Sequence, residues 1–353
     1  MSARIDALVE AGEIGGRTVR VSEGGDVECH TYPVAPLAQG CVRVRTTRSA
    51  ISAGTELTYI GGAATNVHLH RRWDARLRLF VDAGAGLDPP LVFGYRATGR
   101  IVESGVADLP AGTRIYGKWR HTEYVALAVD LARAQRVPEA LEDEDAVDLA
   151  HMAPICVNAV AEAEDLIAGR PAVVFGAGTI GLITAQVARA SGATEVVVVD
   201  RLAERLEVAD HLGLETILAR EDVAVRLKRD RGPDAFPVAF ECTGAAAGLH
   251  EAIRTVAPRG RVIAVGFYQG GAAELELCDE FHHNAVRVVA AQIGNIHPAW
   301  TIETLRARAI ALTLARRLVL GALPRLELPV ERAREGFAAL RRPAEVLQVA
   351  LRY

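Results

Sequence analysis

A glycine-rich hexapeptide is the clearest candidate in this sequence for binding a phosphate group. It reads Gly176-Ala177-Gly178-Thr179-Ile180-Gly181. It directly follows the apolar run AVVF and opens a segment whose apolar residues recur at helical spacing. In that context the first glycine permits a tight turn, the second lets the backbone approach a pyrophosphate, and the third lets the helix pack on its strand. The helix amino terminus would face the phosphates, so the segment predicts a dinucleotide-binding loop.

An acidic residue at the end of the next apolar run favours NAD over NADP. The run EVVVVD ends in Asp200, 24 residues after Gly176. A carboxylate there can accept hydrogen bonds from the adenosine ribose and would repel a 2′-phosphate. Arg201 could instead bind such a phosphate, although packing over the adenine is its more ordinary role. We expect NAD as the cofactor, with further binding residues beside Asp200 and in two later loops at strand ends: Arg205, Thr243, Gly266 and Phe267.

Two large polar residues interrupt the otherwise apolar stretch PPLVFGYRATGRIV at residues 89–102. Tyr95 can donate a hydrogen bond to a substrate oxygen, and a nearby cation such as Arg96 or Lys118 could lower its pKa towards a usable range. We therefore expect Tyr95 to act in catalysis and Arg96 and Lys118 to contact the substrate. The plainer alternative is that Tyr95 is a packed aromatic side chain.

The segments that must position these residues divide the chain into two domains. Glycine and proline break residues 1–147 into short strand-like pieces, which is typical of a mostly antiparallel, barrel-like domain. Residues 148–294 alternate short β-branched runs with helix-length segments, which predicts a doubly wound parallel sheet. Residues 295–353 are expected to return and complete the first domain. The predicted fold class is α/β.

Length, charge and cysteine spacing narrow the function classes. A chain of 353 residues is too long for one compact core. Its net charge of -4 and its lack of a basic stretch give no reason to expect a nucleic-acid or membrane partner, so a small-molecule substrate is favoured. Five separated cysteines encode neither a disulfide framework nor a thiolate zinc cluster. The amino terminus does not read as a secretory signal, and we expect a cytoplasmic protein.

Four further stretches carry a family resemblance that covers nearly the whole chain. SAISAGTELTYIGG, FGYRATGRIVESG, LPAGTRIYG and HTEYVALAVDLARAQRVPE resemble the G-I-C-G-T-D, G-H-E-x-x-G-x-V-x-x-x-G, V-G-D-R-V and F-A-E-Y-V-x-V-P motifs of the medium-chain dehydrogenase/reductase superfamily, the alcohol dehydrogenase relatives. The resemblance implies a GroES-like β-barrel-type catalytic domain plus a Rossmann doubly wound domain. The residues of these motifs are most similar to those of zinc-lacking members, namely bacteriochlorophyllide hydroxyethyl dehydrogenase-like and sugar or polyol biosynthetic dehydrogenases.

The departures from the family pattern concern the catalytic zinc. Zinc-dependent members hold the ion with a cysteine, the histidine of G-H-E and a third ligand. The matching positions here are Ala53 (or Ser52), Tyr95 and Ala153, none of which replaces a thiolate or imidazole. Arg96 stands where the acid of G-H-E would be, and its guanidinium would oppose a cation. The four closely spaced cysteines of the structural-zinc lobe are also missing, so we expect no bound metal.

Without zinc, oxidation of an alcohol needs a proton acceptor from the protein or from ordered water. The resemblance matches Thr55 to the hydroxyl that relays protons in zinc members; Glu56 follows it, and Tyr59 lies one short turn later. We expect Tyr95 to contact the substrate oxygen and Glu56 or Tyr59 to act as acid/base. Glu56 could instead pair with an arginine. Asn158 could touch substrate or cofactor, or cap the helix that links the domains.

These residues predict a zinc-independent, NAD(H)-dependent oxidoreductase that interconverts a secondary alcohol and a ketone on a polar biosynthetic metabolite such as a sugar or cyclitol. One alternative is an NAD(P)H-dependent reductase of an activated carbon–carbon double bond, against which Asp200 counts. A second alternative is a non-catalytic NAD(H)-binding sensor. The run VRVVAAQ could pair with itself at a sheet edge across a twofold axis, so a homodimer or homotetramer is expected.

Overall fold

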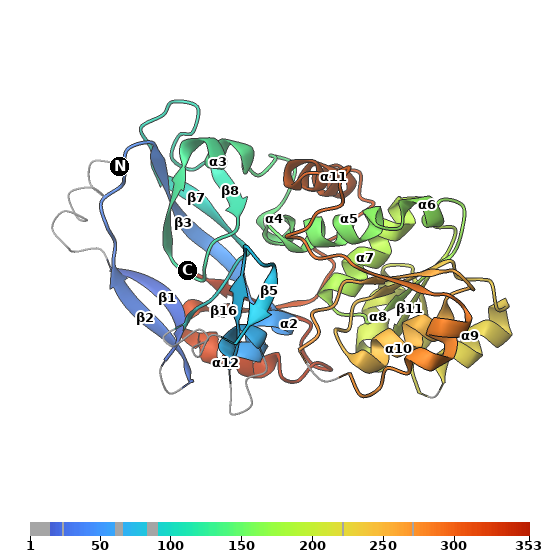
Figure 1. The fold of residues 1–353 in the computed structure, drawn as a ribbon. Helices are drawn as coiled ribbons and strands as arrows, with labels where there is room; N and C mark the ends of the chain where they lie inside the picture. Colours follow the sequence, from blue (N-terminus) through green and yellow to red (C-terminus); the bar gives the residue numbers. More distant parts are fainter. Residues whose placement is uncertain (1–14, 23–24, 61–65, 83–90, 221, 270–271) are drawn as a thin grey trace. The chain divides into compact units, whose positions relative to one another are not determined.

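The chain forms two compact units in a computed structural model, residues 1–151 with 325–353 and residues 152–324. The structure describes residues 15–22, 25–60, 66–82, 91–220, 222–269 and 272–353 (Figure 1). The amino-terminal residues, for which the sequence predicts no secretory signal, lie mostly outside the described residues. No helix in the described ranges is long and apolar enough to cross a membrane.

The first unit is built on a mixed sheet in the order β16-β17-β3-β7-β8, with β9 also paired to β3. Its strands are β3 (Cys41–Ala50), β7 (Ala97–Glu103), β8 (Arg114–Gly117), β9 (Tyr124–Ala128), β16 (Arg325–Pro329) and β17 (Gln348–Arg352). Alternate residues of β3, among them Val42 and Val44, are buried in the core, as the period of a strand requires. This mixed, mostly antiparallel sheet agrees with the barrel-like first domain that the sequence predicts.

Smaller elements complete the first unit. A three-stranded sheet has the order β2-β1-β6, and β4 pairs with β5 in a hairpin. The strands are β1 (Gly15–Val21), β2 (Val27–Pro33), β4 (Arg72–Asp74), β5 (Leu79–Val81) and β6 (Leu91–Val92). The helices are α2 (Ala53–Glu56), α3 (Val129–Ala134), α4 (Asp143–Leu149) and α12 (Ala333–Ala339), with 3₁₀ turns η1 (Leu57–Tyr59), η2 (Val67–Leu69) and η4 (Val330–Arg332).

The second unit is a parallel sheet in the order β12-β11-β10-β13-β14-β15, which is the order of a Rossmann fold. The strands are β10 (Ala172–Phe175), β11 (Val196–Asp200), β12 (Glu215–Leu218), β13 (Val238–Glu241), β14 (Arg261–Ala264) and β15 (Arg287–Ala290). Val173 and Phe175 face a core cluster shared with Leu227 and Ile253 from two covering helices. The predicted α/β class with a doubly wound parallel sheet is confirmed.

Helices alternate with these strands along the chain. They are α5 (Met152–Ala161), α6 (Glu164–Ile167), α7 (Thr179–Ala190), α8 (Ala203–His211), α9 (Val223–Arg231), α10 (Ala246–Thr255) and α11 (Ile302–Leu314), with a π-helical turn η3 (Leu277–Phe281). Residues 295–324 differ from the sequence prediction, because they belong to the second unit. Within them, α11 packs on α5 and buries Leu305, Ala309 and Leu312. Residues 325–353 return to the first unit through β16 and β17.

Candidate functional site

The loop between β10 and α7 has the backbone that a dinucleotide-binding turn requires. Gly176 has φ +100°, a left-handed conformation that side chains rarely adopt. A Cβ on Gly181 would lie only 1.7 Å from the carbonyl oxygen of Gly176, so the close approach of helix to loop depends on glycine there. Thr179 and Ile180 begin α7, where the first backbone N–H groups have no helical acceptor. The loop therefore fits a bound pyrophosphate.

Asp200, at the end of β11, stabilises this loop through a hydrogen bond to Ala177. Its carboxylate accepts hydrogen bonds from the backbone N–H groups of Ala177 at 2.6 Å and Leu202 at 2.9 Å. Because an ionised carboxylate offers roughly four acceptor positions, ribose hydroxyl groups can still bind. Arg201 is exposed, whereas Arg205 is half-buried and burial lowers its pKa. A Cβ on Gly178 would lie 3.6 Å from Nη1 of Arg205, which places this guanidinium beside the loop.

Two later loops meet at the same edge of the sheet. A Cβ on Gly266 would lie 2.3 Å from the backbone nitrogen of Gly244, the residue after Thr243, so the loops touch directly. Phe267 is 44% exposed and is therefore not a core residue. The four predicted binding regions of this unit, residues 176–181, 200–205, 243 and 266–267, lie at the carboxyl ends of β10, β11, β13 and β14, where ligands bind in such sheets.

The sequence analysis missed Glu241, the residue that ties these loops together. Glu241 is buried at the end of β13 and accepts hydrogen bonds from the backbone N–H groups of Thr243 at 2.7 Å and Gly244 at 3.2 Å. The Tyr268 hydroxyl donates to Oε2 of Glu241, the oxygen that also accepts from Gly244, and burial together with the Glu241 carboxylate raises the pKa of Tyr268. An acidic residue inside an apolar strand, directly before the predicted loop, is the signal that could have identified it.

In the first unit, polar side chains surround Tyr95. Its half-buried ring packs edge-on against His151, with the ring centroids 4.9 Å apart. Burial raises the pKa of Tyr95, and so does the Glu56 carboxylate; interactions with the side chains of Ser52 and Thr55 oppose the increase. The predicted lowering of its pKa by Arg96 is wrong, because that charge is outweighed. His151, which the sequence analysis did not select, is a neighbour of this tyrosine.

Glu56 is buried and pairs with a histidine. Its carboxylate accepts the backbone N–H of Ser52 at 2.9 Å, and its other oxygen lies 2.8 Å from Nε2 of His121. Nδ1 of His121 lies 2.7 Å from Oγ of Ser49. The alternative that Glu56 pairs with an arginine is wrong, because the side chain that its carboxylate contacts among the described residues is His121. Sequence reasoning missed this pair because 65 residues separate the two side chains.

The other predicted residues of the first unit have different surroundings. Arg96 is 2% exposed, and its guanidinium donates to the carbonyl oxygens of Ala50 at 3.1 Å and Ile51 at 2.9 Å. It also contacts Asp148 and Gln348, so nothing around it supports the expected contact with substrate.

Tyr59 is half-buried against Phe93, with the ring centroids 5.3 Å apart, and burial raises its pKa. Lys118 is exposed.

Asn158, in the second unit, is not a helix cap. It lies inside α5, is fully buried, and its side-chain oxygen accepts the backbone N–H of His297 at 3.0 Å. Its Nδ2 group has no hydrogen-bond partner among the described residues. An unpaired buried amide costs roughly 1–3 kcal/mol, so a bound group that accepts from Nδ2 would be favoured. Asn158 on this helix therefore makes a structural contact with the backbone of His297, and its Nδ2 group remains available as a donor.

The residues at the family's zinc positions do not fit a catalytic zinc ion. In the first unit, Ser52 and Tyr95 supply hydroxyl groups and Ala53 supplies no ligand atom. Across the described ranges, no group of three or more His, Cys, Asp or Glu side chains could hold a metal ion. Glu56 and His121 are bonded to each other and make only a pair. A zinc site needs at least three such protein ligands, so no step is assigned to a metal.

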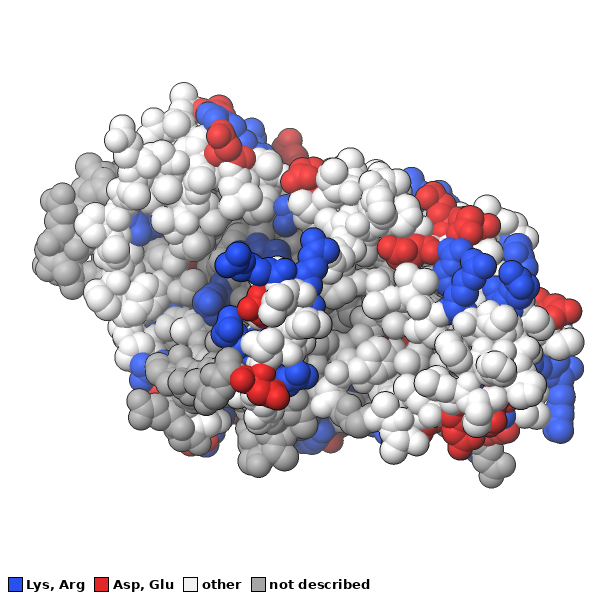
Figure 2. Space-filling view, in the orientation of Figure 1, with Lys and Arg blue, Asp and Glu red and all other residues white. Residues whose placement is uncertain are grey.

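An exposed, arginine-rich hairpin is a further feature of the first unit. Arg72 lies on β4, and Arg76 and Arg78 lie in the turn that leads to β5. Trp73 and Leu77 are exposed on the same hairpin. Figure 2 shows positive side chains gathered on the visible face in the region that Figure 1 labels β5. This surface could contact an anionic group.

Comparisons with known proteins agree with this architecture. A family model for "Zinc-binding dehydrogenase" matches residues 179–308. The chain is 35% identical to YdjL, a zinc-type alcohol dehydrogenase-like protein of Escherichia coli K12, over 37% of each chain. It is 28% identical to D-guloside 3-dehydrogenase of the same organism, over 74% of this chain and 77% of that protein.

One solved structure has a similar fold over nearly the whole chain. The crystal structure of 2R,3R-butanediol dehydrogenase from Bacillus subtilis aligns with 96% of this chain and 99% of its own, with a TM-score of 0.76 and 21% sequence identity. The match to the family model lies in the second unit, away from positions 52, 53 and 95, and does not bear on zinc. Taken with the strand order and the loop geometry, these likenesses show that the chain has the fold of the solved butanediol dehydrogenase and that residues 179–308 are similar to the zinc-binding dehydrogenase family.

Proposed function

We propose that this protein is a zinc-independent, NAD(H)-dependent oxidoreductase that interconverts a secondary alcohol and a ketone. The observation that carries the proposal is the group of polar side chains around Tyr95, the residue at the position of the zinc-binding histidine in the motif it resembles: the Glu56 carboxylate and the hydroxyl groups of Ser52 and Thr55 act on it. The relatives named for butanediol and a guloside support an alcohol substrate. A polar substrate such as a sugar or cyclitol suits a site with hydroxyl and carboxylate groups.

Each residue in the proposal has one task. The N–H groups of the Gly176–Gly181 loop bind the pyrophosphate, and Asp200 accepts from the adenosine ribose. When bound, the nicotinamide ring accepts or returns the hydride. Tyr95 donates a hydrogen bond to the substrate oxygen, a role that a raised pKa favours because the hydroxyl stays protonated. Glu56 or Tyr59 accepts the alcohol proton, with Thr55 close to the Tyr95 hydroxyl.

The proposal predicts a preference for NADH. We expect NADPH to bind roughly 10- to 100-fold more weakly, because its 2′-phosphate would meet the Asp200 carboxylate. Asp200→Asn should narrow the difference, while Asp210→Asn, an exposed carboxylate on α8, should leave it unchanged. Titration of each nucleotide by fluorescence measures the ratio. Tighter binding of NADPH would contradict the proposal and favour the double-bond reductase.

The role of Tyr95 predicts a kinetic defect with little loss of stability. Tyr95→Phe keeps the ring against His151 and removes only the hydroxyl. We expect kcat for alcohol oxidation to fall about 100-fold, as is typical when a donor to the reacting oxygen is lost. Tyr124→Phe, a half-buried tyrosine on β9, serves as the control. A fall in kcat for Tyr95→Phe with unchanged NAD⁺ affinity, measured by steady-state kinetics, would support the role. A wild-type kcat in this variant would refute it.

Assembly into a homodimer or homotetramer remains a prediction. It is supported by β15, which forms one edge of the parallel sheet and leaves Arg287 and Val288 exposed. An open edge strand offers unpaired backbone groups to a second copy. Light scattering on the purified protein would decide the number of chains.

A further inference from the structure

A chain of hydrogen bonds runs from Glu56 to the hydroxyl group of Tyr353, whose pKa is raised by burial. Oε2 of Glu56 lies 2.8 Å from Nε2 of His121, and Nδ1 of the same ring lies 2.7 Å from Oγ of Ser49. Oγ of Ser49 lies 3.0 Å from the hydroxyl oxygen of Tyr353 on the neighbouring end of the sheet. Glu56, His121 and Ser49 are buried, whereas Tyr353 is only half-buried. The four groups connect the candidate acid/base to the protein surface.

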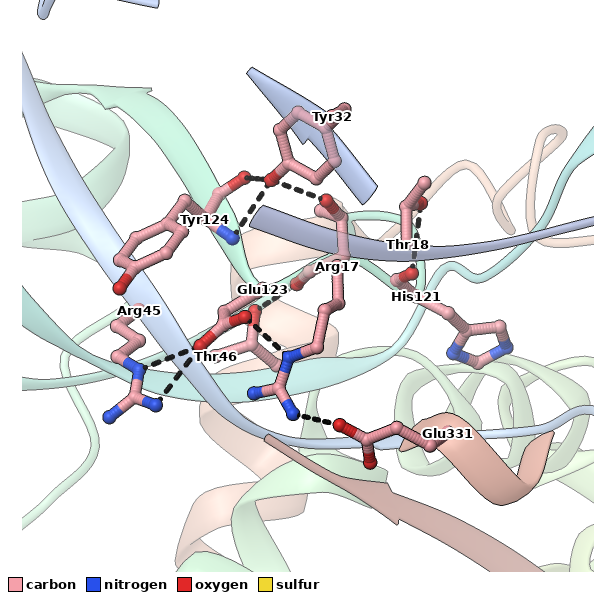
Figure 3. Close-up of polar contacts among 10 residues, drawn as sticks. Arg17, Thr18, Tyr32, Arg45, Thr46, His121, Glu123, Tyr124 and Glu331 are labelled. Carbon is pink, nitrogen blue, oxygen red and sulfur yellow. Dashed lines mark hydrogen bonds and ion pairs between the residues drawn. The ribbon is translucent and has the colours of Figure 1, made fainter. Parts of the chain in front are cut away.

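The backbone around His121 fixes the direction of its ring. Its N–H donates to the carbonyl oxygen of Phe93 at 2.7 Å, and its own carbonyl oxygen accepts from the Val19 N–H at 2.8 Å and the Thr18 hydroxyl at 3.1 Å. Figure 3 shows the Thr18 contact and the ring pointing away from the Glu123 carboxylate. Both ring nitrogens are therefore presented to Glu56 and Ser49 without a search through rotamers.

The residues that follow His121 hold this segment in place from the other side. The Glu123 carboxylate binds Arg17 at 2.7 Å and Arg45 at 3.0 Å, which lie on β1 and β3 (Figure 3). The backbone N–H of Glu123 also donates to the Arg17 carbonyl oxygen at 2.7 Å. Because the Glu123 carboxylate forms ion pairs with Arg17 and Arg45, it does not compete with the Glu56 carboxylate for the imidazole of His121.

A purely structural role would not need these groups. A buried carboxylate is costly unless it is paired, and an apolar aromatic ring could fill the same space without burying one. The motif that this stretch resembles has phenylalanine at the position of His121. Tyr59, the alternative acid/base, packs on Phe93, and burial raises its pKa, so its hydroxyl stays protonated and has no site to accept the alcohol proton. The paired ring of His121 is therefore a candidate for proton transfer.

We propose that His121 is a positioning residue that takes the substrate proton from Glu56 and passes it through Ser49 to Tyr353, an inference that rests on the alcohol oxidation proposed above. It assigns the acid/base role to Glu56 rather than Tyr59. The proton that the alcohol gives to Glu56 leaves its carboxyl oxygen as an N–H bond forms at Nε2 of His121. The Nδ1 proton moves to Oγ of Ser49, the Ser49 proton moves to the Tyr353 oxygen, and Tyr353 releases its own proton to water. The reverse order supplies a proton for carbonyl reduction.

Four variants of the protein test the relay, and one of them, Glu56→Gln, is used for the NMR measurement. His121→Phe removes both ring nitrogens, and Tyr353→Phe removes only the outer hydroxyl. Thr18→Val is the matched control, because Thr18 binds the His121 backbone and not its ring. Alcohol oxidation with NAD⁺ is measured in H₂O and D₂O, and ¹⁵N NMR of the cofactor-free protein reports on the His121 ring.

We expect kcat to fall roughly 100-fold in His121→Phe and about tenfold in Tyr353→Phe, within the range of lost acid–base assistance, with KM little changed. The solvent isotope effect on kcat should change in both variants and not in Thr18→Val. The ¹⁵N shifts of His121 should move in Tyr353→Phe and Glu56→Gln and stay in place in Thr18→Val.

Two outcomes would overturn the relay while leaving the proposed function intact. One is an active wild-type protein whose kcat and isotope effect survive in folded His121→Phe. The second outcome applies if His121→Phe does not fold. It is a Tyr353→Phe protein whose kcat, solvent isotope effect and His121 ¹⁵N shifts are those of the wild type. A wild-type protein that oxidises no alcohol across a broad panel would instead count against the proposed function, and the NMR measurement would still show whether the four groups share protons.

Discussion

Replacing Gly181 with alanine is expected to weaken NADH binding about 100-fold or more, a loss of roughly 2.7 kcal/mol or more. The added Cβ would lie 1.7 Å from the Gly176 carbonyl oxygen. Neither a Cβ nor a backbone oxygen can move away by a rotamer change, so the loop and α7 must separate. Forcing extra atoms into a tight contact typically costs 1–3 kcal/mol of folding free energy. Both the nucleotide affinity and the melting temperature should therefore fall.

Gly178→Ala is the matched comparison for this effect. A Cβ at Gly178 meets only Nη1 of Arg205, at an ordinary contact distance of 3.6 Å, so the free protein should keep its stability. The same methyl group would stand where the backbone approaches the pyrophosphate, so NADH affinity should still fall. Fluorescence titration and thermal unfolding separate the two effects. Undiminished affinity in both variants would remove the loop from the cofactor site.

Replacing Arg96 with methionine is expected to destabilise the first unit by about 3–5 kcal/mol, the usual result of breaking a buried ion pair on one side. Arg96 and Arg325 share the Asp148 carboxylate, which is fully buried. Methionine would leave Asp148 with one partner and would remove the donors to Ala50 and Ile51. Urea unfolding followed by fluorescence, taking the first transition, measures the change.

Arg133→Met provides the control for an exposed arginine. Arg133 pairs with Asp108 and Asp130 at the surface, where such pairs contribute about 0–1 kcal/mol. A small change there and a large change for Arg96→Met would establish Arg96 as a framework residue. If Arg96→Met instead unfolds like the wild type and shows a raised KM for the alcohol, the original expectation of a substrate contact would be restored.

Contiguous features of the sequence predicted the second unit well. The loop at residues 176–181, the strand before it and Asp200 lie within one short stretch, so local spacing carries the geometry. The alternation of strands and helices likewise predicted the parallel sheet. The boundary near residue 295 was misplaced, because a surface helix such as α11 reads the same whichever unit it covers.

The candidate site in the first unit could be predicted only in part. Tyr95 and Glu56 were selected, but His121 and Tyr353 lie far from Glu56 in the sequence and join it and Ser49 in one hydrogen-bonded chain only in the folded unit. Long-range pairing of this kind leaves no periodic signal in the sequence. The direction of the Tyr95 pKa was also missed, because burial depends on packing and not on the neighbouring residue in the chain.

The central claim is that side chains, and not a metal ion, serve the reacting oxygen. Its most direct test combines metal analysis of the purified, active protein with NAD⁺-linked alcohol oxidation before and after exposure to a strong zinc chelator. We predict far less than one zinc ion per chain and undiminished turnover after chelation. A zinc ion bound at one per chain, with activity that disappears on chelation and returns when zinc is restored, would contradict the account.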